Sequence, residues 1–274
     1  MAAIARARRP DGAAEPFVAL MRRYCIDYTN SHDLSVCDEI MRPDYTLHMA
    51  EHHLTGRDEA YKPAVLAQLR QFPFLGLVVH DVVTNGDRLA LRFSEHGASV
   101  KHDARLASWS GIGVYRWDGS RLQENFVEQD YWSRRRQLDT GQPLELLPPA
   151  LDPWMVAAAA SDDRTEAAAR AWLAKGTFGG GEVRVDDSWR SGSPQPRFDV
   201  HEVAVDDLFT AGTSAAFHVT ITGTYRGGLP GLDDHIGATV DHYAAGVVSI
   251  DHERVRGDVI TDRLGLERRL APRR

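Results

Sequence analysis

The residues of this 274-residue chain best suited to chemistry are the carboxylates of a predicted β-strand that ends at Asp130. Side chains of a strand alternate between two faces, so four residues share one face: Glu124, Phe126, Glu128 and Asp130. If that face lines an apolar pocket, loss of water raises the pKa of Asp130 and makes it a usable general base. The alternative is that Asp130 caps a helix predicted over residues 131–138.

Two further side chains could assist such a base. A neutral His48 imidazole near the mouth of a pocket could donate a hydrogen bond to a substrate carbonyl or orient Asp130, or it could be structural. Arg92 lies in a strand and points away from its apolar neighbours. Directed inward, it would bind a substrate carboxylate or enolate, or pair with Glu124. Three aromatic residues could line the pocket or belong to the core: Tyr24, Tyr45 and Trp109.

Neither metals nor cofactors are predicted. Histidines spaced like His48 and His52 bind one ion when they lie on a helix, but this segment, which also holds His53, is predicted as strand and loop. Cys25 and Cys37 form no CxxC pair, which argues against a disulfide framework or a cysteine-rich zinc site. The chain also lacks glycine-rich nucleotide-binding motifs and a Gly-x-Ser-x-Gly elbow.

The composition limits the kinds of molecule that the protein is expected to bind. The chain has 39 acidic and 32 basic residues and a net charge of −7, which argues against binding to nucleic acid. Apolar residues make up 43% of the chain, enough for a sizeable core, but no apolar run has the length of a membrane span. With two cysteines, a reducing cytoplasm is the expected location. A small apolar molecule is the expected partner, with no nucleic acid and no membrane.

An internal repeat sets the organisation of the chain. Residues 79–97 and 205–223 align without a gap and share Asp81/Asp207, Gly86/Gly212 and other positions. Each stretch has the pattern strand, glycine turn, strand, and each is followed by an Asp-x5-Arg-x-Leu ending that starts at Asp130 or Asp262. The sequence therefore predicts two copies of one domain.

The predicted boundaries follow from this repeat. A flexible tail is expected over residues 1–14, the first domain over 15–138, a proline-rich linker over 139–153, and the second domain over 154–274. In the first copy, amphipathic helices precede four strands, predicted at residues 77–84, 88–96, 106–117 and 121–130. Helices followed by antiparallel strands indicate an α+β fold, with the helices packed on one face of a curved sheet.

An ordered set of short motifs in copy one carries a family resemblance. It comprises Asn30-x-His32-Asp33-Leu34, Pro43-Asp44-Tyr45-x-x-His48, Gly86-Asp87-Arg88 and Tyr115-Arg116-Trp117-Asp118-Gly119. Residues 15–140 resemble the SnoaL-like polyketide cyclase or ester cyclase branch of the nuclear-transport-factor-2-like superfamily. The resemblance implies a cone of curved sheet capped by three helices around an apolar pocket, with an acid/base carboxylate near Asp130. It also implies dimers through the outer sheet face, which a tandem chain could form internally as a pseudo-dimer instead of a homodimer.

Copy two resembles the family only over about residues 203–270, and it lacks the first two motifs. It is expected to be a degenerate, mainly structural partner, with Asp262 and His218 as its candidate site residues; His218 stands where copy one has Arg92. The leading functional hypothesis is acid/base catalysis on a small apolar carbonyl compound, as in polyketide-type aldol cyclisation. The alternatives are a non-catalytic small-molecule binder or scaffold, and epoxide ring opening by Asp130, Arg92 and Asn125.

Overall fold

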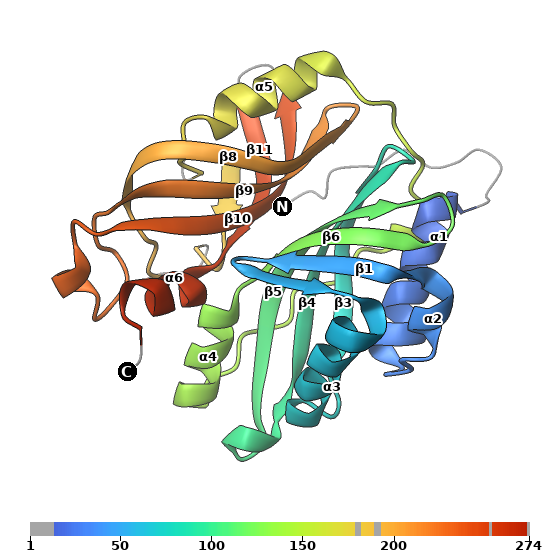
Figure 1. The fold of residues 1–274 in the computed structure, drawn as a ribbon, viewed down its shortest axis with the longest axis horizontal. Helices are drawn as coiled ribbons and strands as arrows, with labels where there is room; N and C mark the ends of the chain where they lie inside the picture. The colour runs from blue at the N-terminus through green and yellow to red at the C-terminus, as the bar shows by residue number, and fades with distance from the viewer. Residues whose placement is uncertain (1–13, 179–181, 189–192, 252–253, 273–274) are drawn as a thin grey trace.

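Two curved β-sheets, each with its own helices, make up the molecule (Figure 1). The structure is a computed structural model that describes residues 14–178, 182–188, 193–251 and 254–272. The predicted tail, residues 1–14, lies almost entirely outside the described residues. The α+β architecture of two tandem domains, predicted from the internal repeat, is confirmed.

The first domain contains a six-stranded sheet in the order β2-β1-β6-β5-β4-β3. Neighbouring strands are antiparallel except for β1 and β6, which run parallel. The four predicted strands correspond to β3 to β6, whereas the short β2 was not predicted. The bounds are β1 Met41–Met49, β2 His52–Thr55, β3 Gly76–Thr84, β4 Arg88–Ser99, β5 Arg105–Trp117 and β6 Leu122–Gln129.

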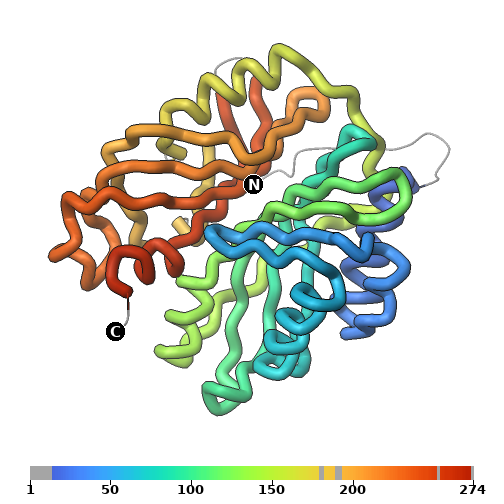
Figure 2. The backbone as a smooth tube through the Cα atoms, in the orientation of Figure 1, coloured from blue at the N-terminus to red at the C-terminus, as the bar shows by residue number. Residues whose placement is uncertain are grey.

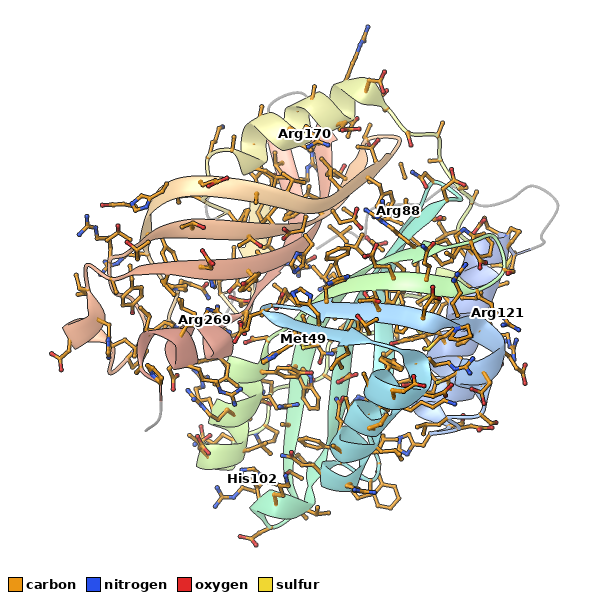
Figure 3. The ribbon with its side chains drawn as sticks, in the orientation of Figure 1. Met49, Arg88, His102, Arg121, Arg170 and Arg269 are labelled. Carbon is orange, nitrogen blue, oxygen red and sulfur yellow. The ribbon has the colours of Figure 1, made fainter. Side chains whose placement is uncertain are left out.

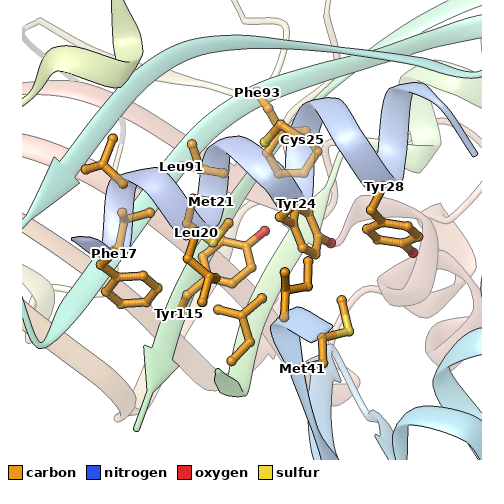
Figure 4. Close-up of a cluster of buried hydrophobic side chains, with 14 of the residues drawn as sticks. Phe17, Leu20, Met21, Tyr24, Cys25, Tyr28, Met41, Leu91, Phe93 and Tyr115 are labelled. Atoms are coloured by element: carbon orange, nitrogen blue, oxygen red, sulfur yellow. The ribbon is translucent and has the colours of Figure 1, made fainter. Parts of the chain in front are cut away.

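Helix α1, Pro16–Arg23, anchors the core of this domain. It begins with a proline in its first turn, and the Glu15 carboxylate accepts a hydrogen bond from the backbone N–H of Val18 at 2.9 Å. The chain continues as a π-helical segment, Tyr24–Asn30, and the apolar side of both packs towards the sheet (Figure 4). The other helices are α2 Val36–Ile40, α3 Lys62–Gln71 and α4 Tyr131–Thr140, with a further π-helical turn at Arg57–Tyr61 before α3.

The second domain repeats the plan with a five-stranded sheet in the order β7-β11-β10-β9-β8. Its parallel pair, β7 and β11, occupies the place of β1 and β6, and α6 follows β11 as α4 follows β6. Asp130 and Asp262 cap these two helices in the same way. The bounds are α5 Asp163–Leu173, β7 Glu182–Val185, β8 Phe198–Ala211, β9 Ser214–Tyr225, β10 Thr239–Asp251, β11 Arg254–Thr261 and α6 Arg263–Leu270.

The outer faces of the two sheets pack against each other. One buried apolar cluster joins side chains of both sheets: Val83, Ala90, Ile112 and Val114 with Phe209, Ala216, Ala245, Val247 and Ile260. Ion pairs flank this cluster, and Figure 3 labels two of the arginines that form them. Arg88 pairs with Asp207, and Arg269 of α6 pairs with Glu51 in the β1–β2 turn. Association of two chains stays a prediction.

The connection between the domains contains little regular structure. After α4 the chain has neither helix nor strand until a short 3₁₀ turn, Pro153–Met155, and Ala150 donates a backbone hydrogen bond to Val79 of β3 at 2.9 Å. Among the described residues, no helix is long and apolar enough to cross a membrane. Figure 2 shows α3 and α4 at the same end of the first sheet, on either side of the β4–β5 turn.

Candidate functional site

A cavity of about 470 Å³ lies in the first domain between the inner face of the sheet and the helices. This volume falls within the range of small-molecule sites. Its walls are mainly apolar and aromatic. The charged and amide side chains that line it are Gln68, Gln71, Glu95, Lys101, Asn125, Gln129 and Arg134.

Strand register decides which side chains reach the cavity. Glu95 of β4 lies opposite Trp109 of β5, and further along the same face Tyr115 of β5 lies opposite Asn125 of β6. Gly111 lies between them and leaves room for the ring of Phe93, because a Cβ at this glycine would lie 2.5 Å from a ring carbon. The inner face of β6 therefore consists of its odd-numbered residues.

Glu95 is a buried carboxyl on the cavity wall, with 6% of its surface exposed. Its Oε2 accepts a hydrogen bond from Nε2 of Gln68 on α3 at 2.8 Å. Burial raises the pKa of Glu95 to about 7, while the positive charge of Arg134 and the hydrogen bond from Gln68 oppose the rise. Glu95 can thus gain and lose a proton near neutral pH, which is what general acid/base catalysis requires.

Arg134 brings a positive charge to the same cavity. Its guanidinium lies over the ring of Tyr131 at 4.0 Å and near the rings of Trp109 and Phe72 at 5.0 and 5.6 Å. Burial lowers its pKa. Within the described part of the chain, no carboxylate forms an ion pair with it, although Glu95 interacts with it through space.

Three tyrosine hydroxyls meet at another part of the wall. Tyr28 donates a hydrogen bond to the Tyr61 hydroxyl at 3.0 Å, and the Tyr24 hydroxyl lies 3.1 Å from the same oxygen. Burial raises the pKa of all three, so they are protonated at neutral pH. Such hydroxyls can donate hydrogen bonds to a substrate oxygen.

The predicted base, Asp130, does not line this cavity. Its carboxylate caps α4 by accepting from the backbone N–H of Ser133 at 3.1 Å, and both of its oxygens accept from Nη2 of Arg263 in the second domain at 2.7 Å. Asp130 is 2% exposed. The structure therefore supports the alternative of a helix cap and places Asp130 outside the cavity, where burial still raises the pKa of its carboxyl. A catalytic role for Asp130 stays a prediction.

The face of β6 predicted to line the pocket instead faces the second domain and the outer surface. Glu124 accepts from His48 at 2.9 Å, Phe126 packs against the interdomain cluster, and Glu128 pairs with His218 at 3.0 Å. The alternation was predicted correctly, but the inward face was assigned the wrong way round. Glu124, Phe126 and Glu128 are thus not cavity residues.

Of five other residues predicted for the site, four lie outside the cavity lining and one belongs to it. His48 stacks on Phe126 with ring centroids 4.3 Å apart, outside the cavity, and Arg92 pairs with Asp258 of the second domain at 2.9 Å. Tyr45 is wholly buried behind the cavity wall. Trp109 also lies outside the cavity lining, and its indole nitrogen donates a hydrogen bond to Gln129 at 2.7 Å. Tyr24, in contrast, lines the cavity.

Asp130 pairs with Arg263, and Arg92 pairs with Asp258. The group of residues proposed for epoxide opening is therefore not brought together. Of its three members only Asn125 lines the cavity. Within the described ranges, no group of three or more histidine, cysteine, aspartate or glutamate side chains is arranged to hold a metal ion.

The second-copy candidates lie at the domain interface. Asp262 caps α6 by accepting from Gly265 at 2.8 Å and pairs with Arg269 at 3.0 Å; burial and the charge of Glu128 raise its pKa to about 7. His218 lies between Glu128 and Asp206, and its hydrogen bonds to these carboxylates outweigh burial and raise its pKa to about 9. These groups connect the domains and form no cavity site.

The second domain also fixes a helix that supplies the cavity. Arg263 is fully buried and binds three carboxylates: Asp130 at 2.7 Å, Asp187 at 2.7 Å and Asp186 at 3.3 Å. Asp130 starts α4, and Tyr131 and Arg134 in the first turns of α4 line the cavity. Arg263 therefore holds the N-terminus of α4 in position.

Sequence reasoning missed Glu95, although a signal was present. It stands in a predicted strand on the same face as Phe93 and Leu91, and an acidic residue on an apolar strand face is costly unless it has a role. Arg134 stands in a run of three arginines with Arg135 and Arg136, a pattern that is typical of a solvated helix face. In the structure Arg135 pairs with Glu267 of the second domain, while Arg134 lines the cavity.

The first domain is thus a cone-shaped α+β domain whose curved sheet and helices enclose one cavity. Residues 21–125, which lie within the first domain, match the family model of the SnoaL-like domain, and the resemblance seen in the sequence is confirmed. No curated protein matches the chain.

Several solved structures are similar to this chain. IdmH from Streptomyces antibioticus, a proposed polyketide cyclase, is 23% identical, with 46% of this chain and 99% of that chain covered and a TM-score of 0.40. A proposed polyketide cyclase from Acidithiobacillus ferrooxidans is 18% identical, with 45% and 94% covered and a TM-score of 0.40. AclR from Streptomyces galilaeus, a proposed hydroxylase, is 19% identical, with 47% and 96% covered and a TM-score of 0.40.

Proposed function

We propose that the first domain binds a small, mainly apolar carbonyl compound and catalyses proton transfer on it, with Glu95 as the general base. The observation that carries this proposal is a buried carboxyl on the wall of a cavity of about 470 Å³, with a pKa of about 7. A carboxyl with a pKa near neutral pH can both take a proton and return it. The SnoaL-like match of residues 21–125 supports an activity of this general kind.

Polyketide-type aldol cyclisation illustrates the chemistry. The Glu95 carboxylate takes a proton from the carbon beside a carbonyl, and the C–H electrons form an enolate. Hydroxyls of the Tyr24, Tyr28 and Tyr61 group stabilise the enolate oxygen by hydrogen bonds. The enolate carbon then bonds to a second carbonyl carbon of the same molecule, and the resulting alkoxide takes the proton back from Glu95. No atom is lost in this sequence.

Exchange of α-protons tests the first step without knowledge of the natural substrate. 2-Tetralone, a bicyclic ketone, is incubated with the protein in D₂O, and loss of its α-proton signal is followed by NMR. We expect exchange above the buffer rate that increases as the pH rises through about 7, where Glu95 ionises. Glu95→Gln should lower it by about 100-fold or more, the usual contribution of a general base.

The matched control is Glu124→Gln, which removes a carboxylate outside the cavity and should leave exchange unchanged. Exchange that survives in Glu95→Gln would remove Glu95 from its role. Binding of 2-tetralone without any exchange would favour the non-catalytic binding protein.

A further inference from the structure

The charge of the cavity wall is opposite to that of the chain. The protein has a net charge of −7. Among the described side chains that line the cavity, however, Arg134 and Lys101 are permanent cations and Glu95 is the one carboxyl. The two cations outnumber the one carboxyl, so the wall carries an excess of positive charge, and burial adds to this excess because it raises the pKa of Glu95.

Arg134 differs from the arginine that follows it on α4. Arg135 binds both carboxylate oxygens of Glu267 in the second domain. Arg134 has no such partner among the described residues, and aromatic rings cover it instead. The Arg134 guanidinium lies over the rings of Tyr131 and Trp109, at 4.0 and 5.0 Å from their centroids, so these rings restrict its position. The planar fork of donors on a guanidinium matches a planar acceptor with two oxygens.

The rest of the wall suits an apolar, unsaturated body. Tyr24, Tyr28, Phe93 and Tyr115 line the cavity together with aliphatic residues such as Leu47 and Val65. A carboxylate is the planar, two-oxygen acceptor that matches a guanidinium, and it would bring the negative charge that the wall lacks. Lys101, exposed on the short turn after β4, adds a second positive charge that attracts anions towards the cavity.

We infer that the natural ligand of this cavity is a carboxylic acid with an apolar, unsaturated body, whose carboxylate binds the Arg134 guanidinium. This inference rests on the proposed function, since it names the substrate class of the same site. The ketone chemistry would then take place on a keto acid, with the carboxylate at Arg134 and the reacting carbon at Glu95.

Binding of 2-naphthoate and of its neutral analogue 2-naphthamide, measured by titration calorimetry, tests the inference. The two probes share size and shape and differ in charge. A hydrogen bond to a charged group is stronger than one between neutral groups, so the wild-type protein should prefer 2-naphthoate by roughly 10-fold to 100-fold. In Arg134→Gln this preference should fall to about one, because the charged donor is gone.

Two further variants keep the outcome clear. Arg136→Gln, on the same helix but outside the cavity lining, should retain the preference. Arg134→Lys keeps the charge but loses the planar fork, so it should retain part of the preference, and it serves if Arg134→Gln does not fold. Equal or tighter binding of 2-naphthamide by the wild-type protein, binding of neither probe, or a full preference in Arg134→Gln would overturn the inference.

The two proposals can fail separately. If 2-naphthoate is preferred through Arg134 but 2-tetralone shows no Glu95-dependent exchange, the cavity binds acids without catalysis. If exchange depends on Glu95 while the preference for 2-naphthoate is absent, the site catalyses proton transfer on uncharged substrates. Glu95→Gln should bind 2-naphthoate at least as well as the wild-type protein, because it removes the one negative charge of the described lining.

Discussion

The substitution Glu95→Gln should stabilise the folded protein above neutral pH, even though it removes a polar charge from the proposed site. Burial raises the pKa of Glu95 from its ordinary value of 4.5 to about 7. One unit of pKa corresponds to about 1.4 kcal/mol, so ionised Glu95 costs the folded state roughly 3 kcal/mol. Glutamine has the same shape, carries no charge, and can still hydrogen-bond with the Gln68 amide.

The sign of the pH dependence follows from the raised pKa. Below pH 4.5 Glu95 is protonated in both the folded and the unfolded protein, so the two proteins differ little in their free energy of unfolding. Between pH 4.5 and about 7 the unfolded chain has lost the proton and the folded protein still holds it, so the wild-type protein loses stability relative to the variant as the pH rises. Above pH 7 the advantage of Glu95→Gln should level off at roughly 3 kcal/mol.

Urea unfolding followed by tryptophan fluorescence at pH 4.5, 6, 7 and 8.5 measures this difference. Comparing the two proteins at each pH cancels the contributions of other titrating groups, such as Asp186 and Asp262. Glu124→Gln is the control: it removes a carboxylate that pairs with His48 and Arg116, so it should not stabilise the protein at high pH. A difference between the wild-type protein and Glu95→Gln that stays flat from pH 4.5 to 8.5 would refute the reasoning.

The domain interface gives two more predictions. Arg263→Met leaves Asp130 and Asp186 buried without their cation, so the free energy of unfolding at pH 8 should fall by about 3–5 kcal/mol. At pH 5 the decrease should be smaller, because protonation of these carboxylates relieves the loss. An equal decrease at both pH values in urea unfolding would contradict this. His218 has a pKa raised to about 9 by its two carboxylate partners, so its pairing stabilises the folded protein fully below pH 6.5 and this stabilisation disappears as the pH rises through about 9. The destabilisation caused by His218→Gln should therefore shrink by roughly 3 kcal/mol between pH 6 and pH 10; destabilisation that grows over this range in chemical unfolding would count against the assignment.

The sequence was enough to predict the two domains and the strands because these depend on local patterns. Alternating residues and the Asn85-Gly86 and Asp118-Gly119 turns define the hairpins of the first copy. The repeat then transfers this pattern to the second copy. The short β2 escaped notice because its residues, His52–Thr55, form a strand only by pairing with β1.

The candidate site was predicted less well than the strands, because tertiary packing decides which face of a strand points inward. In β6 both faces carry polar residues, and alternation alone does not show which face meets the helices. The second domain resolves this ambiguity, since it covers Glu128 with His218 and leaves Gln129 to the cavity. The ion pair of Asp130 could not be predicted for a similar reason: its partner, Arg263, lies 133 residues further along the chain.

Comparison of the two copies shows why we assign the proposed cavity chemistry to the first of them. In the ungapped alignment Glu95 corresponds to Ile221, a buried core residue of the second domain. On the side of the second sheet that α5 covers, Trp172, Phe178 and Phe217 pack against one another. The second copy thus has an apolar side chain at the position of the proposed base, whereas its Arg263 secures the helix that bears Arg134. In the proposed mechanism, the first copy supplies the reacting groups and the second copy holds them in place.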